Sequence, residues 1–362
     1  MHSDGCVYIY RAFSASKDAR VDRNASLFDG RQIHIIDFNE TTRLGFVRNS
    51  RENGFLKRVF FYACFLALVI PYHVIKSNKQ DIHVFMDLEC AFFGVPFARL
   101  FFKRCIFDIV DPYGYTKIKQ SKVLSKLFVY IEYLYSKMAN VTLVPDQKRA
   151  DIYPGEINAV IIENIPILND KVKPTLADDV VDKIKAMREK YSTVIGYFGS
   201  LDRKTRGLDL LLDFAKTNPD AAVLIGGMGN FEVELSRCDL ENVYFFGKFG
   251  QGDLQTFFDA IDYSWMYYSF NDRLHEIACP NKYYEHINFD CPVITSSIIP
   301  QSKIILEYNS GVILEEADTA AILRNKLDQF VITSFVDKYA ENYPDDYYPA
   351  KAKELHDRLA SA

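Results

Sequence analysis

The sequence has little tryptophan and no cysteine pattern that would hold a metal or a disulfide framework. Only one of its 362 residues is Trp, whereas Phe and Tyr number 28 and 23. Its seven cysteines form no Cys-x-x-Cys pair and have no metal-ligand spacing to the histidines, a pattern typical of reduced thiols. The first residues lack the basic segment and the cleavage site of a signal peptide. We therefore expect a cytosolic protein without a metal site.

The composition excludes a disordered, collagen-like or coiled-coil chain. Hydrophobic residues make up 49% of the sequence and charged residues 25%, as in ordinary globular proteins. At roughly 150 residues per domain, the length predicts about two domains. The charge is unevenly divided: Lys and Arg number 24 against 18 Asp and Glu up to Lys173, and 19 against 30 after it. The two halves are thus predicted to face different partners.

Apolar strand-like runs alternate with helix-like segments throughout, which favours parallel βαβ units. Strands are predicted at 6–11, 32–37, 82–87, 105–111, 141–145 and 159–164, and again at 193–200, 221–227, 243–248, 262–269, 292–297 and 311–316. The segment 166–174, with two prolines, is the best linker. These elements predict two doubly wound α/β units in tandem, which place ligands at the carboxyl ends of their strands.

Two loops after strands of the second half carry candidate anion-binding residues. Gly199 and Ser200 end one strand, and Arg203, Lys204 and Arg206 precede the next helix, whose N-terminus adds partial positive charge. A solvated basic turn is the alternative. Gly226, Gly227 and Gly229 follow another strand but do not form a Gly-x-Gly-x-x-Gly fingerprint. They are interpreted as a close-approach loop, whose backbone can lie close to a ligand, or as a plain tight turn.

The segment from 270 to 297 is the most informative. Pro280, Asn281 and Lys282 stand at a predicted helix start, where free N–H groups and the lysine are suited to a diphosphate. Glu285 lies one turn inside and is suited to accept hydrogen bonds from ribose or sugar hydroxyls. An ordinary capped helix with a surface Lys and Glu is the alternative.

These segments resemble the conserved blocks of GT-B glycosyltransferases, particularly glycosyltransferase family 4. PNKYYEHINFDCPVITSS is similar to the family's PNK-x-x-E-…-PVI-x-S segment, and VIGYFGSLDRKTRGLDLLL to its first donor-domain block. LIGGMGNFEVEL and NVYFFGKFGQGDLQTFFDAIDYSWM resemble the next two blocks, and AFSASKDARVDRNASLF resembles the opening of a subgroup. The resemblance covers most of the chain.

The resemblance implies a fold and a set of site residues. It predicts two Rossmann-like domains facing a central cleft: an acceptor domain at 1–168, with the C-terminal helix 345–362 packing back on it, and a donor domain at 169–344. Arg206, Lys282 and Asn281 would hold the diphosphate of a nucleotide-sugar, and Glu285 would bind the ribose. Gly199 and Ser200 would line the approach to the phosphates, and Gly247 and Lys248 would border the base pocket.

The sequence departs from the family pattern at two donor positions and one acceptor position. Ile277 stands where the first Glu of the E-x7-E motif is expected, with Glu276 one residue away, and Ser200 replaces a basic residue for which Arg203 or Lys204 would compensate. Val110 stands at the position where the family has its active-site His. Asp111 is then the first candidate to contact the acceptor hydroxyl and Asp87 the second, with a turn-capping Asp as the alternative.

The resemblance implies sugar transfer with retention of configuration, from a UDP- or GDP-linked donor to a saccharide or lipid-linked saccharide in surface glycan synthesis. Arg206, Lys282 and helix N–H groups would stabilise the leaving diphosphate. No metal and no separate cofactor are expected, and the acid pairs 178–179 and 345–346 are interpreted as surface residues. The alternatives are a GT-B nucleotide-sugar epimerase and a non-catalytic nucleotide-sugar-binding subunit. Nucleic-acid binding is not expected.

Two segments of the basic half indicate contact with a membrane. Residues 59–75 carry no formal charge but contain Pro71, and Lys117, Lys119, Lys122, Lys126 and Lys137 stand among aromatic and aliphatic residues. Such a helix is suited to lie on anionic lipid. The alternatives are a helix buried against the sheet and a solvated basic face. Peripheral attachment at the inner face of the plasma membrane is favoured over a span.

Overall fold

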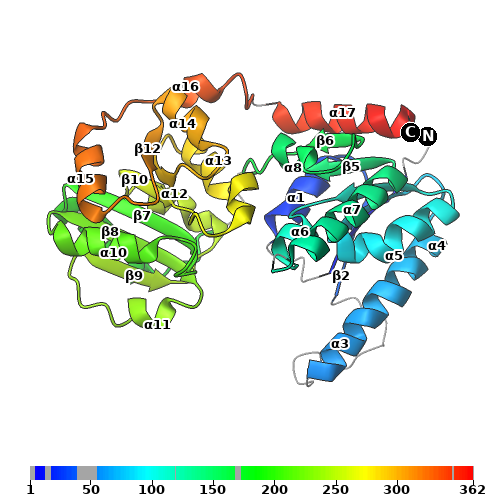
Figure 1. Cartoon of the computed structure of the whole chain (residues 1–362), viewed down its shortest axis with the longest axis horizontal. Coiled ribbons are helices and arrows are strands. Elements are labelled where there is room, and N and C mark those ends of the chain that lie inside the picture. Colours follow the sequence, from blue (N-terminus) through cyan, green and yellow to red (C-terminus); the bar gives the residue numbers. More distant parts are fainter. Residues whose placement is uncertain are drawn as a thin grey trace. The chain divides into compact units, whose positions relative to one another are not determined.

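The structure is a computed structural model that describes residues 5–12, 18–38, 55–118, 120–167, 173–344 and 346–361. The chain divides into two compact units, Met1–Asn164 with Asp345–Ala362, and Ile165–Pro344. Figure 1 shows the order of the elements along the chain. The division falls four residues before the predicted one, and the chain crosses back to the first unit near Pro344. The central cleft between the units stays a prediction.

The first unit contains a six-stranded parallel sheet with the strand order β2-β1-β3-β4-β5-β6. Its strands are β1 (Val7–Arg11), β2 (Ile33–Asp37), β3 (Ile82–Met86), β4 (Arg104–Asp108), β5 (Val141–Val144) and β6 (Ala159–Ile161). Every residue of β3 and β5 is buried, as expected of parallel strands covered on both faces. β1 pairs with both β2 and β3, so the strand order reverses there.

Helices cover both faces of this sheet. One face carries the helical run α3 (Phe55–Cys64), a π-helical turn (Phe65–Val69) and α4 (Ile70–Lys76), together with α5 (Asp87–Leu100) and α7 (Lys122–Met138). The other carries α1 (Ala19–Ser26) and α17 (Tyr347–Ser361). The short helices α6 (Tyr113–Thr116) and α8 (Gln147–Asp151) complete the unit. The helix predicted over Lys117–Asn140 begins later, where the Ser121 hydroxyl accepts from the Leu124 amide; Lys119 lies outside the described residues.

The second unit repeats the plan with the strand order β12-β11-β10-β7-β8-β9, all parallel. Its strands are β7 (Thr193–Ser200), β8 (Ala221–Met228), β9 (Val243–Gly247), β10 (Tyr263–Met266), β11 (Val293–Ser296) and β12 (Gly311–Leu314). β7 pairs with β8 on one side and with β10 on the other, and this is again where the strand order reverses.

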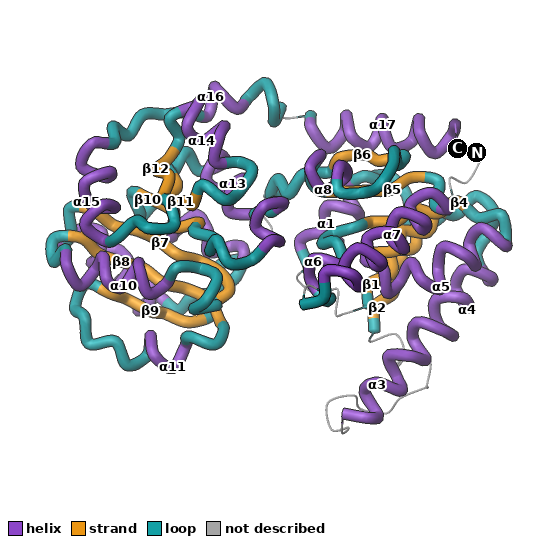
Figure 2. The backbone as a smooth tube through the Cα atoms, in the orientation of Figure 1, coloured by secondary structure: helices purple, strands orange, loops and turns teal. Residues whose placement is uncertain are grey.

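The helices of the second unit again lie on both faces of the sheet, as Figure 2 shows. They are α9 (Asp178–Lys190), α10 (Leu208–Thr217), α11 (Glu232–Leu235), α12 (Leu254–Phe258), α13 (Asn281–Asn288), α14 (Ser302–Tyr308), α15 (Ala320–Gln329) and α16 (Val336–Tyr339). Two 3₁₀ turns span Gln251–Asp253 and Arg273–Ile277. Residues 168–172 of the predicted linker lie outside the described residues, and α14, α15 and α16 were not anticipated.

The apolar segment 59–75 forms the end of α3, the π-helical turn and α4. Phe65, Leu66, Val69, Ile70 and Val74 are buried in the core of the first unit. The stretch Val59–Lys76 is long and apolar enough to cross a membrane by length and composition, with a mean hydropathy of 1.8. A core helix meets the same criterion, and the packing of these five side chains is that of a helix that covers the sheet.

Candidate functional site

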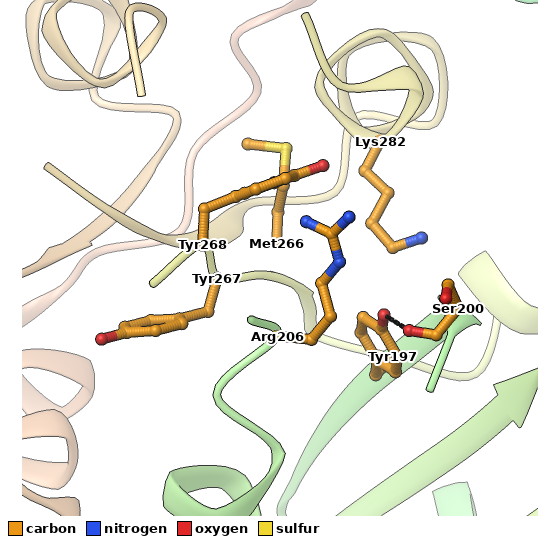
Figure 3. A pocket seen from close by; sticks show the side chains of 7 residues that line it. All are labelled: Tyr197, Ser200, Arg206, Met266, Tyr267, Tyr268 and Lys282. Atoms are coloured by element: carbon orange, nitrogen blue, oxygen red, sulfur yellow. Dashed lines mark hydrogen bonds between the residues drawn. The ribbon is translucent and has the colours of Figure 1, made fainter. Parts of the chain in front are cut away.

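The candidate site of the second unit lies where the strand order of the sheet reverses. β7 ends at Ser200 and its neighbour β10 ends at Met266, so that the loops after them leave the same edge of the sheet in opposite directions. Parallel sheets bind ligands in the crevice that such a reversal opens. A small pocket of about 80 Å³ lies there. Figure 3 shows the side chains that line it: Tyr197, Ser200, Arg206, Met266, Tyr267, Tyr268 and Lys282.

Arg206 projects into this pocket from the loop between β7 and α10. The indole N–H of Trp265 donates to the Arg206 carbonyl at 2.8 Å, which ties the loop to β10. The guanidinium carbon lies 4.3 Å from the centre of the Tyr268 ring. Its Nη1 is buried and makes no hydrogen bond to any residue that the structure describes. A buried donor without a partner is costly, and an anionic oxygen in the pocket would satisfy it.

Lys282 enters the pocket from the first turn of α13. Its ammonium donates to the Phe198 carbonyl and lies over the Tyr197 ring, 5.2 Å from the ring centre. Burial lowers the pKa of Lys282; the Glu285 carboxylate opposes this shift, whereas the Arg206 guanidinium adds to it. Two neighbouring cations in a part-buried pocket disfavour each other's charge. A bound anion would relieve this repulsion.

Glycines at the strand ends bring backbone close to the ammonium of Lys282. A Cβ built on Gly199 would lie 2.7 Å from the Lys282 Nζ, and one on Gly227 would lie 1.7 Å from the Gly199 carbonyl oxygen. Gly199 and Gly227 are direct partners across β7 and β8. Gly227, which meets backbone and has a φ of 139°, therefore requires glycine, whereas the contact at Gly199 is with the flexible end of the Lys282 side chain. This supports the interpretation of Gly227 as part of a close-approach loop.

Several predicted site residues lie outside the pocket. Arg203 is exposed, pairs with Asp209 at 3.0 Å and stacks on the Phe231 ring, so it does not replace the missing cation after Gly199. Gly247 and the exposed Lys248 stand at the end of the edge strand β9, two strands from β7. Their predicted contact with the base stays a prediction.

The start of α13 matches the predicted geometry. Pro280 is the residue before the helix, and Asn281 and Lys282 form its first turn. Glu285 lies three residues after Lys282, on the same side of the helix, and is close enough to act on the pKa of that lysine. Ile277 is buried, whereas Glu276 is exposed.

Sequence reasoning missed the aromatic lining of the pocket. The predicted strand over 262–269 ends at Met266, so that Tyr267 and Tyr268 belong to the loop beyond it. The Tyr268 ring is held edge-to-face against His275 at 4.9 Å, and the His275 Nδ1 lies 2.7 Å from the Ser269 carbonyl oxygen. The signal available in the sequence was a pair of tyrosines directly after an apolar run.

A second polar cluster lies at the reversal point of the first sheet. Arg11 ends β1, and its guanidinium pairs with Asp87, which directly follows β3, and with Asp18 at 2.8 Å. Asp87 has a φ of 59°, a left-handed conformation that is uncommon outside glycine and that turns the chain from β3 into α5. Burial raises the pKa of Asp87 to about 7, against the opposing effect of Arg11.

The other acids after these strands have different surroundings. Asp111 lies beyond the end of β4, and its side chain is 48% exposed, against 18% for Asp87. It pairs with Arg149 at 2.9 Å. Asp108 is fully buried and pairs with Arg20. Val110 is partly buried and packs on the core shared with α1 and α17. Among the described residues, no group of three or more His, Cys, Asp or Glu is placed to hold a metal ion.

The fold is shared with solved glycosyltransferase structures, although the sequence alone matches neither a family model nor a curated protein. Anabaena HepE in complex with UDP has a TM-score of 0.65 and 13% identity over 99% of this chain and 100% of its own. Sucrose-phosphate synthase from Thermosynechococcus elongatus has a TM-score of 0.62 and 12% identity over 99% and 94%. WaaG, a glycosyltransferase involved in lipopolysaccharide biosynthesis, has a TM-score of 0.55 and 14% identity over 99% of both chains.

These likenesses span nearly the whole of each chain, both units included. Two parallel six-stranded sheets, each covered by helices on both faces, form the architecture that the motif resemblance predicts. The predicted fold class is therefore confirmed: the chain has the two-domain α/β fold of GT-B glycosyltransferases.

Proposed function

We propose that this chain is a retaining, metal-independent glycosyltransferase that moves a sugar, of the hexose class, from a nucleotide-sugar to a saccharide or lipid-linked saccharide. The observation that carries the proposal is the buried Nη1 of Arg206, which has no hydrogen-bond partner among the described residues and lies in a pocket that Lys282 shares. The pocket has the chemistry of a diphosphate site: two cations and the N-terminus of α13 within one small volume. HepE, which has the same fold, has been solved with UDP and with UDP-glucose.

In the proposed reaction, the bond between the anomeric carbon of the sugar and the diphosphate oxygen breaks. The nucleoside diphosphate leaves with both electrons of that bond, and a bond forms between the acceptor oxygen and the same carbon. Arg206, Lys282 and the partial positive charge at the N-terminus of α13 stabilise the negative charge that develops on the leaving group. Glu285 accepts hydrogen bonds from the ribose hydroxyls.

For the acceptor we propose Asp87 in preference to Asp111. Asp87 stands at the reversal point of its sheet, where ligands of doubly wound folds bind, and is less exposed than Asp111. A carboxyl group whose pKa is near 7 is suited to take a proton at neutral pH. In this scheme Asp87 takes the proton of the acceptor hydroxyl, and Arg11 orients the Asp87 carboxylate.

A non-catalytic nucleotide-sugar-binding subunit is the second candidate. It is favoured by Ile277, which is buried where the family motif has a Glu that touches the donor sugar. The two candidates differ in turnover: a glycosyltransferase releases UDP from a UDP-sugar when an acceptor is added, whereas a binding subunit leaves the UDP-sugar intact.

Isothermal titration with UDP, GDP and their sugars tests the donor site. Arg206→Gln should weaken binding of the preferred nucleotide at least tenfold, about 1.4 kcal/mol. Arg203→Gln is the matched control, since Arg203 comes from the same loop but pairs with Asp209. The nucleotide affinity of this variant should stay within about twofold of that of the parent chain. Equal affinities for the two variants would refute the diphosphate assignment.

Activity that EDTA abolishes and Mn²⁺ restores would refute metal independence.

A further inference from the structure

The helix α7 in the first unit is apolar on its outer side as well as on the side that packs against the core, where Phe128, Val129 and Ile131 lie. Its buried positions are Ser125, Val129, Glu132 and Ser136, three of which are polar. Its exposed large apolar side chains are Val123, Leu124, Leu127, Tyr130, Leu134 and Met138. Most of the exposed set recurs every three or four residues and so forms one stripe along the helix. A helix at the surface of a soluble protein normally carries polar residues on its outer side, so this outward stripe is suited to contact an apolar partner.

The neighbouring helices extend this apolar surface. α5 contacts both α7 and α4, and Figures 1 and 2 show the three helices on the same side of the first sheet. The exposed Phe92 of α5 stacks on Tyr135 of α7 with ring centres 5.9 Å apart. The π-helical turn and α4 add Leu68, Tyr72 and Ile75. We call the exposed side chains of the π-helical turn, α4, α5 and α7 together the outer helical face.

The charges of the outer helical face are of one sign. Its exposed cations are Lys76, Arg99, Lys122, Lys126 and Lys137. The acids of the same helices are shielded: Asp87 and Glu89 are partly buried in the first turn of α5, and Glu132 is buried. Apolar side chains flanked by lysine and arginine are suited to the headgroup region of an anionic bilayer.

The turn after α5 adds a second, independent observation. Phe102 is 84% exposed, and its backbone has a φ of 54°, a conformation that costs a non-glycine residue about 1–2 kcal/mol. Phe101 beside it is also exposed, and the exposed Arg99 and Arg104 stand on either side of the pair. This left-handed residue closes the end of α5, where the Lys103 amide donates to the Ala98 carbonyl, and the turn leaves the Phe102 ring in solvent between two cations.

The same observations decide between possible occupants. A second copy of the chain, paired through a twofold axis, would place the five cations of one face against the five of the other. A membrane span over Val59–Lys76 would have to withdraw Phe65, Ile70 and Val74 from the core. We propose that the outer helical face docks, without spanning, on a bilayer that contains anionic lipid. This inference does not depend on the proposed glycosyl transfer.

Flotation of the full chain with two kinds of vesicle tests the proposal. The protein should float with phosphatidylcholine vesicles that contain phosphatidylglycerol, should float less with phosphatidylcholine alone, and should detach as salt is raised. The pair Leu127→Asp and Leu134→Asp should lower binding about tenfold or more. The triple change Lys122→Glu, Lys126→Glu and Lys137→Glu should abolish the preference for phosphatidylglycerol.

Matched controls separate docking from misfolding and from self-association. Leu306→Asp with Val331→Asp changes two exposed apolar residues of the second unit and should leave flotation unchanged. All of the variants should keep the parent melting temperature, because the changed side chains are exposed. The proposal is overturned if the parent fails to float at low salt, or if the leucine and control pairs bind equally. It is also overturned if the parent forms a dimer in sedimentation that Leu127→Asp dissociates.

Discussion

The guanidinium carbon of Arg206 lies 4.3 Å from the centre of the Tyr268 ring. The two residues come from different loops, one after β7 and one after β10, and meet at the point where the strand order of the second sheet reverses. The ring supports one face of the guanidinium, while the buried Nη1 makes no hydrogen bond within the described part of the chain. The contact therefore holds the guanidinium in the pocket, where the proposed diphosphate would meet its Nη1.

Replacing Tyr268 tests this positioning. A cation–π contact is worth about 1 kcal/mol, so Tyr268→Ala should weaken UDP binding roughly fivefold. Tyr268→Phe keeps the ring and should bind UDP nearly as well as the parent chain. Isothermal titration measures both. If the phenylalanine variant loses as much affinity as the alanine variant, the hydroxyl rather than the ring carries the effect, and the stacking account is wrong.

Glu285 should act on the ribose and not on the diphosphate. Its removal in Glu285→Ala should weaken UDP binding about tenfold, or 1.4 kcal/mol, while the affinity for pyrophosphate, which has no ribose, should change little. Asn288→Ala, an exposed position on the same helix, serves as the control. A parallel loss of pyrophosphate affinity would show that Glu285 acts instead through Lys282, whose pKa it raises.

Asp87 should control the acid side of the pH profile. Burial raises its pKa to about 7, the nearby Glu89, Asp108 and Asp111 act in the same direction, and Arg11 opposes them. Transfer needs the ionised carboxylate, so the rate of UDP release from a UDP-sugar should fall as the pH drops through about 7. Asp87→Asn should abolish this release and leave UDP affinity intact, whereas Asp111→Asn should retain activity. The reverse ranking would move the acceptor contact to Asp111.

Glu132 should make the first unit less stable at alkaline pH. Burial raises its pKa to about 8, so the folded state keeps a proton that the unfolded state releases near its ordinary pKa of about 4.3. The stability that this carboxyl contributes is thus fully present below about pH 4 and is lost as the pH rises to about 8.

Glu132→Gln removes that dependence and keeps an acceptor for the Tyr113 amide, which donates to Glu132 at 2.8 Å. Between pH 5 and pH 8 the melting temperature of the parent should fall further than that of the variant. Parallel curves for the two proteins would show that Glu132 is ionised in the folded chain.

Much of the fold could be predicted because parallel strands covered on both faces are continuous apolar runs. The limits of β1, β5 and β8 lie within a residue of those expected from composition, since a charge, a glycine, an asparagine or a proline bounds each run. Asp111 was placed at a strand end, but β4 stops at Asp108. The apolar Ile109-Val110 pair continues the pattern beyond the strand, and the Ile109 amide still donates to the Leu143 carbonyl of β5, so periodicity alone could not find the end.

The candidate site was predictable in its residue types and only partly in its contacts. Arg203, Lys204 and Arg206 stand in one loop, and their spacing alone does not indicate which one faces the pocket, whereas the family resemblance singled out Arg206. Arg203 pairs with Asp209 in α10, whereas Arg206 meets Tyr268, which is distant in the sequence. For α7, periodicity predicts an apolar stripe but not which side of the helix meets the sheet; only packing shows that Ser125 and Glu132 face inward.

A crystal structure of the full chain with UDP tests the central claim most directly. The account predicts diphosphate oxygens within hydrogen-bond distance of the Arg206 Nη1 and the Lys282 Nζ, with the ribose hydroxyls at Glu285. A UDP molecule bound elsewhere, with Arg206 Nη1 still unpartnered, would contradict it.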